Sequence, residues 1–214
     1  MEFADLVRTR RMTRAFSARE VPDAILVDIV DLASRSPSAG KSQGWNLVVL
    51  RGARTDELWS RTFTPESRRT FRWQAMFDAP IVALSFADPD AYLARYSEPD
   101  KAHTGLGESP ERWPAPTWTI DAAFATMTLL HAAHDRGLGA LFFHVDKGRN
   151  DVLAALGIPA QWVLLGAVAL GWPLDATGES AASDPARGAG RSATRRRRAA
   201  TDIIHLDRYS PGAR

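Results

Sequence analysis

Two largely apolar segments, 80–86 and 161–170, each with a single polar side chain (Ser85 and Gln161), constrain the fold of this chain more than any other feature. Short apolar runs without an alternating polar face are typical of strands that lie buried inside a sheet. Residues 45–50 have the same character, and residues 140–145 form a shorter candidate strand. The sequence therefore predicts a sheet with buried strands.

Helical periodicity separates these strands. Helices are expected over 2–10, from Pro22 to about 33, over 55–63, 120–136 and 149–156. The helix over 120–136 carries an apolar stripe of Ile120, Ala123, Phe124, Met127 and Leu130, and Gly137 is its expected end. Alternation of strands and helices indicates an α/β or α+β fold, and the length of 214 residues suits a single domain over 1–214.

Two other stretches differ in composition from these elements. Residues 88–118 are rich in proline, glycine and charge, and we interpret them as a long excursion outside the core. Residues 177–198, built largely of alanine, glycine, serine and arginine, are expected to form a flexible C-terminal arm. Apolar character resumes at 202–206, so the tail after the arm is expected to dock on another surface.

Composition and missing motifs exclude several function classes. No run approaches the about 18 apolar residues of a membrane span, and the first residues lack the pattern of a secretory signal, so a cytoplasmic location is expected. The absence of cysteine excludes thiolate chemistry and disulfides. His131 and His134 lack a third ligand at metal-site spacing, so no metal is expected. The dinucleotide fingerprint, the P-loop and the Gly-x-Ser-x-Gly motif are all missing.

Arginine clusters near both ends are the best candidates for a binding site. Arg10, Arg11 and Arg14 follow the first helix, and Arg195–Arg198 form an uninterrupted block. Arginine supplies the planar, bidentate donors that a phosphate needs. Solvated chain ends that complement a helix dipole explain the same pattern, so both interpretations stay open on spacing alone.

Short motifs are spread over the chain in a fixed order. They are Arg-Arg-Met-Thr-Arg-Ala-Phe at 10–16, Ser-Pro-Ser-Ala-Gly-Lys-Ser-Gln-Gly-Trp at 36–45, Gly-Leu-Gly at 137–139, Leu-Gly-Ile-Pro at 156–159, Ala-Leu-Gly-Trp-Pro at 169–173 and Arg-Arg-Arg at 195–197 followed by Ile204-His205. In this order they resemble the landmarks of the nitroreductase family of FMN-dependent oxidoreductases. The fold that this resemblance implies is α+β, with a mainly antiparallel central sheet flanked by helices, in an intertwined homodimer.

The resemblance also implies a flavin site in which both arginine clusters meet the FMN phosphate. The cofactor-binding residues that it carries over are Arg10, Arg11, Met12, Arg14, Pro37, Ser38, Ala39, Gln43, His144, Val145, Arg195 and Arg197. Arg10 is expected to reach the phosphate and ribityl chain, Arg14 the N1–C2 edge of the flavin, and Gln43 the isoalloxazine edge. Which of Arg195–Arg198 contact the phosphate stays open.

The activity implied by the resemblance is a ping-pong reaction. NADH or NADPH passes a hydride to flavin N5 and leaves, and an electron-poor acceptor of nitroaromatic or quinone type then takes it. No catalytic side chain is required. The substrate-binding candidates are Lys41, Trp113, Trp118 and Phe124. Packing in a core or interface is an equal alternative for Trp113 and Trp118, which otherwise form an aromatic wall over a flat ligand.

Members of the family are homodimers that hold FMN between subunits, and their C-terminal arm embraces the partner. A small-molecule acceptor is the other expected partner, whereas neither nucleic acid nor a membrane is expected. The sequence departs from the family pattern at Met12 (usually Ser), Lys41 (usually Asn) and Gly44 (usually Pro). Lys41 either adds positive charge near the flavin or substrate, or points to solvent.

Several alternatives remain at this level. The chain could be a specialised relative, such as a reductive dehalogenase, a flavin-fragmenting enzyme or a biosynthetic dehydrogenase, or a flavin-storage protein without turnover. Nucleic-acid binding through residues 195–198 is a further class, which the net charge of +2 disfavours. The sequence does not distinguish NADH from NADPH, or FMN from a deazaflavin.

Overall fold

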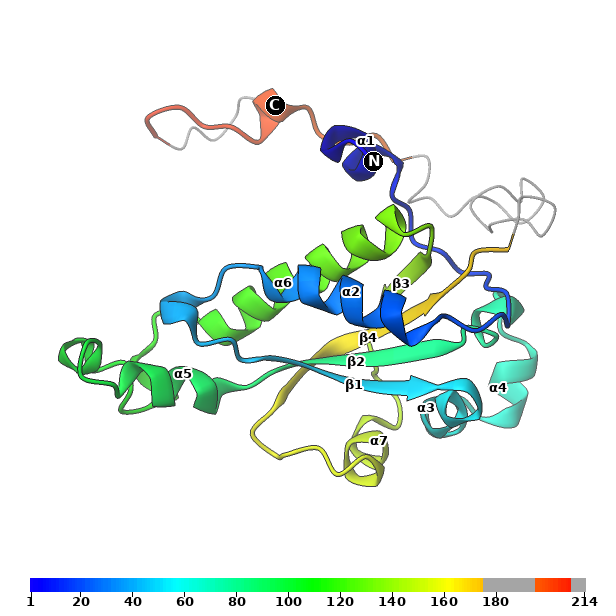
Figure 1. Ribbon diagram of the computed structural model, residues 1–214, viewed down its shortest axis with the longest axis horizontal. Helices are drawn as coiled ribbons and strands as arrows, with labels where there is room; N and C mark the ends of the chain where they lie inside the picture. The colour runs from blue at the N-terminus through cyan, green and yellow to red at the C-terminus, as the bar shows by residue number, and fades with distance from the viewer. Residues whose placement is uncertain (175–194, 209–214) are drawn as a thin grey trace.

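The computed structural model describes residues 1–174 and 195–208 (Figure 1). Its helices are α1 (Phe3–Thr9), α2 (Asp23–Ser34), α3 (Asp56–Thr62), α4 (Pro65–Arg69), α5 (Pro89–Tyr96), α6 (Thr117–Asp135) and α7 (Arg149–Ala155). Its strands are β1 (Trp45–Arg51), β2 (Ile81–Ala87), β3 (Gly139–Phe143) and β4 (Val163–Gly171). Short 3-10 turns include η1 (Ala39–Lys41) and η7 (Ala200–Asp202). Most of the expected arm, 177–194, lies outside the described residues.

The four strands form one antiparallel sheet in the order β1-β2-β4-β3. The central strand β2 is buried at every position, because it has a strand on each side and helices on both faces. This arrangement confirms the α+β fold with an antiparallel sheet flanked by helices, and it confirms the four predicted strands with boundaries shifted by one or two residues.

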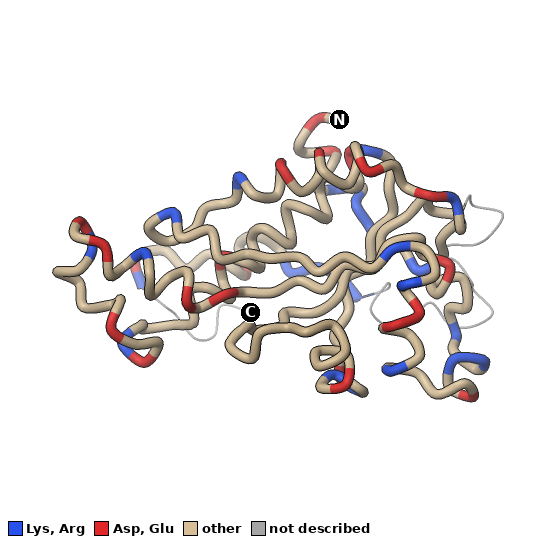
Figure 2. Tube along the Cα trace, turned by 60° about the horizontal axis from the view of Figure 1, so that its bottom comes forward, with Lys and Arg blue, Asp and Glu red and all other residues tan. Residues whose placement is uncertain are grey.

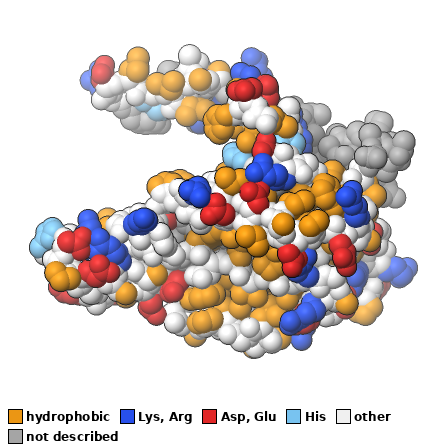
Figure 3. Space-filling model, viewed as in Figure 1, with side chains coloured by type: hydrophobic (Ala, Val, Ile, Leu, Met, Phe, Trp, Pro, Cys, Tyr) orange, Lys and Arg blue, Asp and Glu red, His pale blue; other side chains and the backbone are white. Residues whose placement is uncertain are grey.

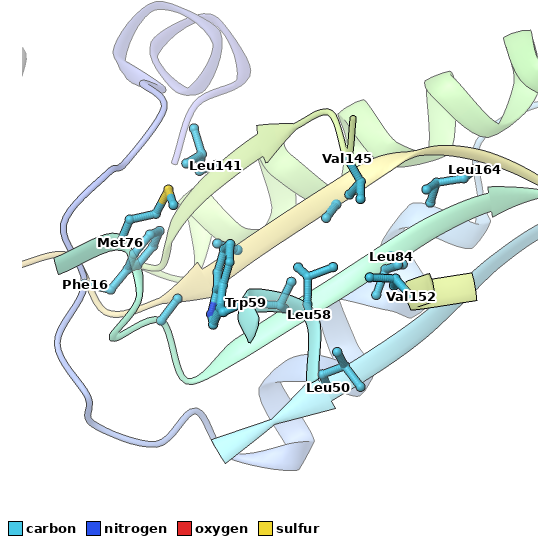
Figure 4. Packing of buried hydrophobic residues seen from close by; sticks show 14 of the residues in the cluster. Phe16, Leu50, Leu58, Trp59, Met76, Leu84, Leu141, Val145, Val152 and Leu164 are labelled. Atoms are coloured by element: carbon cyan, nitrogen blue, oxygen red, sulfur yellow. The ribbon is translucent and has the colours of Figure 1, made fainter. Parts of the chain in front are cut away.

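Side chains of β2 alternate between two apolar clusters, one on each face of the sheet. Val82 and Leu84 pack with Trp59 of α3 in the cluster shown in Figure 4. Ile81 packs with residues of α2 and α6 on the opposite face. On that same face the Ser85 hydroxyl lies 2.8 Å from the Thr126 hydroxyl of α6. In Figure 1, α2 and α6 cover one face of the sheet, and α3 and α7 cover the other.

The segment after α1 runs along the outer edge of β3. Met12 bridges to Ala140 in parallel orientation, and the Thr13 amide donates to the Ala140 carbonyl at 2.9 Å. A Cβ atom on Gly139 would lie only 2.6 Å from the Thr13 side chain, so this approach requires glycine. Gly137, with a φ of +75°, ends α6 as expected. The Gly-Leu-Gly motif therefore fixes residues 10–14 beside the sheet.

The expectation that residues 88–118 lie outside the core is wrong. They include α5, and Tyr92 of this helix is only 1% exposed. Trp113 is also buried, with its ring 4.7 Å from Tyr96 and its indole N–H donating to the Leu106 carbonyl at 2.8 Å. This small core is not evident from the sequence, because the aromatic residues that form it are dispersed among proline, glycine and charged residues.

The apolar stripe of α6 also differs from expectation. Ile120, Phe124 and Met127 are 42%, 48% and 38% exposed, whereas Asp121 and Thr126 are buried. Within the described residues, no helix combines the length and apolar character needed to cross a membrane.

Candidate functional site

The first helix lies across the last turns of α6 and places the first arginine cluster there. The Thr9 hydroxyl lies 3.0 Å from Nε2 of His134, and the Met1 amino group lies 2.9 Å from the Asp135 carboxylate. Arg10 and Arg11 follow directly, between this contact and the attachment of Thr13 to β3. Arg10 is therefore held close to the end of α6.

The two arginine clusters approach one another at Arg10. The C-terminal segment lies beside α1 in Figure 1. Burial and the charges of Arg11 and Arg197 lower the pKa of Arg10. Nε of Arg10 is buried and has no hydrogen-bond partner within the part of the chain that the structure describes. Arg198 donates to the Asp202 carbonyl, and Arg195 is exposed.

An aromatic cavity of about 570 Å³ opens beside Arg14. Its lining includes Phe63, Phe71, Trp73, Phe143, His144, Val145 and Lys147. The Arg14 guanidinium lies over the Trp73 ring at 4.9 Å, and Arg72 lies 5.4 Å from the same ring. The cavity thus combines a largely aromatic and apolar lining with the positive charges of Arg14 and Lys147, and Asp146 is the acidic residue in the lining.

Both candidates from the end of β3 line this cavity. Val145 is buried, whereas His144 is exposed. Next to them, Phe143 stacks on Trp59 at 5.5 Å. Sequence reasoning brought Arg14, His144 and Val145 to one site, and the structure places all three around one cavity.

Residues 63–73 supply much of the cavity lining, and sequence reasoning missed them. The signal that could have found them is the alternation of basic and aromatic residues in Arg-Arg-Thr-Phe-Arg-Trp at 68–73. This stretch carries no regular periodicity, so it was not associated with an element. Its aromatic rings contact one another in sequence, with Phe63–Phe71 at 5.0 Å and Phe71–Trp73 at 5.6 Å.

The second set of candidates, Pro37, Ser38, Ala39 and Gln43, lies in the loop around η1. Pro37, Ser38 and Gln43 line a separate cavity of about 240 Å³ together with Tyr92 and Asp121. The Ala39 amide donates to the Asp121 carboxylate at 2.8 Å, and the Tyr92 hydroxyl donates to the same oxygen at 2.9 Å. Burial and this hydrogen bond raise the pKa of Tyr92 well above its ordinary value. Asp121 therefore connects the loop to α5 and α6.

The backbone of this loop adopts an uncommon conformation. Gly40, Lys41 and Gln43 have φ angles of +60°, +60° and +54°. Left-handed backbone is unfavourable for a residue with a side chain, so the surroundings must hold it in place. The Arg95 side chain of α5 donates to the Gly40 carbonyl at 2.8 Å and is itself paired with Asp100. The side chain of Lys41 is exposed.

The structure does not bring the two sets together within one chain. Met12 bridges to Ala140, which pairs with Leu170 at one end of β4. The loop precedes Trp45, which pairs through Ala87 to Val163 at the other end. Val163 and Leu170 are seven residues apart along β4, or about 23 Å at the usual rise of a strand.

The substrate-binding candidates do not line the Arg14 cavity. Trp113 packs against Tyr92, Tyr96 and Trp118, which favours the packing interpretation for this residue. Trp118 is half-buried in the same cluster. Phe124 lies on the exposed stripe of α6. Among the described residues there is no group of three or more side chains suited to hold a metal ion.

Comparisons with known proteins identify what the chain is similar to. The model of the Nitroreductase family matches residues 7–172. An NADH dehydrogenase of Thermus thermophilus is 30% identical over 191 residues, which cover 78% of this chain and 84% of that protein.

Solved structures give the same result for the fold. A nitroreductase-like protein from Streptococcus mutans superposes with a TM-score of 0.71 at 17% identity, covering 95% of this chain and 97% of that one. A protein from Exiguobacterium sibiricum, described as a nitroreductase in complex with FMN, superposes with a TM-score of 0.64 at 17% identity, covering 82% and 90%.

Proposed function

Since the chain belongs to the nitroreductase family, as its motifs indicated, we propose that it is an FMN-dependent oxidoreductase. It takes a hydride from NADH or NADPH and delivers it to an electron-poor acceptor of nitroaromatic or quinone type. The observation that carries this proposal is the approach of Arg197 to Arg10, which stands four residues before Arg14 in the sequence, together with the aromatic cavity that Arg14 borders.

The residues present fit the phosphate of FMN. Arg10 has a buried nitrogen without a partner, and a buried donor is costly unless a ligand or water accepts its hydrogen bond. Arg11 and Arg197 add positive charge at the same place. Guanidinium groups bind phosphate through paired, charge-assisted hydrogen bonds. Arg10 and Arg197 would hold the phosphate in this proposal.

The Arg14 cavity fits the flavin ring. Its volume of about 570 Å³ lies within the usual range of small-molecule sites, and its aromatic lining suits a flat heterocycle. FMN, when bound, supplies a ring that accepts and donates a hydride. The charge of Arg14 stabilises negative charge in the cavity, and Phe63, Phe71 and Trp73 exclude water from it. The Exiguobacterium protein supports this assignment because its related fold holds FMN.

We infer that a second copy of the chain completes the site. Ser38 and Gln43 line a different cavity from Arg14 in the single chain, so the loop of a partner is the one that would complete the Arg14 cavity. The exposed stripe Ile120, Phe124 and Met127 supports this inference, since an apolar face of this kind is typical of an interface. Hydrophobic side chains also gather over α2 and β1 (Figure 3).

The edge of the sheet and the C-terminal segment support the same assembly. Within the described residues no strand pairs with the outer edge of β1, and an apolar groove of about 510 Å³ lies between this edge and α2. Ile203, Ile204 and Leu206 are 59%, 59% and 79% exposed. In Figure 3 this segment stands away from the body of the molecule. These apolar surfaces fit an arm that embraces a partner subunit.

Anaerobic visible spectroscopy tests the proposed function. The purified protein, supplied with FMN, should show flavin bands that bleach within seconds after addition of NADPH or NADH. Arg14→Met should slow this bleaching at least tenfold, because it removes a cation beside the ring. Arg19→Met is the matched control: Arg19 also lies over a tryptophan, Trp172 at 4.4 Å, but does not line the cavity.

The other outcomes separate the alternatives. Flavin bands that persist with both reductants would indicate a storage protein. A protein that remains colourless after addition of FMN would contradict the flavin assignment, and the arginine clusters would then be solvated chain ends. Nucleic-acid binding has less support, because basic and acidic residues are interspersed along the described trace (Figure 2).

A further inference from the structure

A second buried nitrogen without a partner lies close to the arginine cluster. It is Nε2 of His131, four residues before the end of α6. This nitrogen has no hydrogen-bond partner within residues 1–174 and 195–208. His134, one turn further along the same helix, differs in this respect. Its Nε2 lies 3.0 Å from the Thr9 hydroxyl. Two histidines in similar surroundings thus differ in whether the structure gives them a partner.

Positive charge surrounds His131 from two directions. His131 lies one turn before His134 on α6, and Nε2 of His134 contacts the side chain of Thr9, the residue next to Arg10. Burial and the charges of Arg10 and His134 lower the pKa of His131. Around them lie Arg11 and Arg197, which act on Arg10. Asp135 is the carboxylate that acts on His134, and it is already paired with the Met1 amino group and with Arg136. The charges that face this histidine are therefore predominantly positive.

We propose that His131 is a further phosphate-binding residue, which donates a hydrogen bond from Nε2 to the anion that Arg10 holds. This inference rests on the proposed function, because it takes that anion to be the phosphate of FMN. Arginine nitrogens can only donate, and Nε2 of histidine donates in one neutral tautomer and in the protonated form. An anion is therefore the ligand that satisfies both unpartnered nitrogens and also offsets the surrounding positive charge.

Protonation of His131 should be coupled to binding of the phosphate. In the absence of the anion, burial and the neighbouring cations hold the imidazole neutral at a pH where an ordinary histidine is already charged. A dianionic phosphate reverses the sign of the local charge and favours the protonated ring. Binding of FMN should then take up a proton from solution, and affinity should fall as the pH rises through the titration of the bound form.

A comparison of FMN with riboflavin isolates this effect, because the two ligands differ only in the phosphate. Apo-protein is titrated with each ligand by flavin fluorescence from pH 5.5 to 8.5, for the wild type, His131→Leu, His131→Gln and His103→Gln. His131→Leu should weaken FMN binding about tenfold or more, with riboflavin affinity unchanged within about twofold. His131→Gln keeps a neutral donor, so it should retain part of the affinity but lose the additional pH dependence seen in the wild type.

His103→Gln is the matched control and should bind FMN like the wild type, since His103 is exposed in the turn η4 (Ala102–Thr104), outside the arginine cluster. Comparison of each variant with the wild type cancels the titration of the phosphate itself. Equal FMN affinity in His131→Leu and the wild type would overturn the inference. A parallel loss of FMN and riboflavin would also overturn it, because it would show a structural role.

A measurement without flavin distinguishes failure of this inference from failure of the proposed function. The imidazole resonance of His131, assigned by its absence in His131→Gln, is titrated by NMR with and without inorganic phosphate. An upward shift of its midpoint in phosphate supports the anion site even if the protein binds no FMN, in which case only the flavin proposal fails. FMN binding together with an unresponsive His131 resonance contradicts the inference alone.

Discussion

At the scale of single residues, the loop around η1 shows where sequence and backbone geometry disagree. Lys41 stands where the family motif usually has asparagine, a residue that tolerates left-handed backbone better than lysine does. Its φ of +60° is therefore unfavourable, and within the part of the chain that the structure describes its exposed side chain makes no hydrogen bond or ion pair that compensates. The neighbouring Gly40 has the same φ without this cost.

Replacing Lys41 should reveal this local strain. Lys41→Gly is expected to raise the free energy of unfolding by roughly 0.5–1 kcal/mol, because glycine adopts the left-handed region without steric cost. Lys41→Ala keeps the Cβ atom and should give no such gain. Urea denaturation of the three proteins at one pH provides the measurement. Equal stabilisation by glycine and alanine would show that removal of the lysine charge, and not relief of the backbone, is responsible.

The candidate site was predictable from sequence only where its residues lie in ordered motifs. Arg10, Arg14 and Val145 follow or precede clear elements, so their motifs indicated their place. Trp73 and Phe71 come together with Arg14 through contacts between distant parts of the chain, which no local periodicity records. His131 was noted in the sequence only as half of a metal-site spacing. That its Nε2 is buried without a partner is evident only from the three-dimensional structure, in which α1 lies across the end of α6.

At the scale of elements, the pattern of apolar residues was enough to locate the sheet and its flanking helices. The strands were found because buried strands are continuously apolar, and α6 because its apolar residues recur at helical spacing. The orientation of α6 was not predictable in the same way. The stripe with Phe124 is exposed in the single chain, while Asp121 and Thr126 are buried through hydrogen bonds to Tyr92 and Ser85.

The connection of α5, α6 and the η1 loop through Asp121 gives a second prediction. Asp121→Ala should destabilise the protein by about 2–4 kcal/mol, because it leaves the Ala39 amide and the Tyr92 hydroxyl buried without their acceptor. Asp31→Ala, which removes an exposed carboxylate paired with Arg35 on α2, should change stability by less than about 0.5 kcal/mol. Chemical denaturation of both variants tests the difference. A comparable effect of the two substitutions would contradict the role of Asp121.

The same connection predicts a dependence on alkaline pH. The pKa of Tyr92 is raised in the folded state, so the unfolded state releases this proton first, at its ordinary value of about 10. Stability contributed by Tyr92 is therefore complete below pH 10 and is lost as the pH rises further, by at most about 1.4 kcal/mol per pH unit. Tyr92→Phe removes the ionisable group, and its unfolding free energy should fall less steeply between pH 9.5 and 11.

At the scale of the whole molecule, the separation of the two candidate sets is the feature that most strongly implies an assembly. If each site combines Arg14 of one subunit with the η1 loop of its partner, two defective subunits should complement one another. Arg14→Glu and Ser38→Glu each place a negative charge in one half of every site, so both homodimers should fail to bind FMN. Within a heterodimer, one site receives both substitutions and the other receives neither.

Co-expression with two affinity tags allows this heterodimer to be purified and assayed. It should bind one FMN per dimer and retain about half of the wild-type reductase activity. The control is a dimer in which both subunits carry Arg14→Glu and each bears a different one of the two tags. It should remain inactive. If the mixed heterodimer is as inactive as both parents, each site must be formed by a single chain.

The meeting of Arg10 with Arg197 has a consequence for biosynthesis. Almost all of the described helices and strands lie between Arg10 and Arg197 in the sequence, so the ribosome adds these two arginines at very different times. The sheet, the aromatic cavity and the helices are all complete in sequence by Gly171, well before Arg197 emerges from the exit tunnel. A nascent chain can therefore contain all four strands before it contains Arg197, so complete binding of the phosphate must wait until the later arginines have been synthesised.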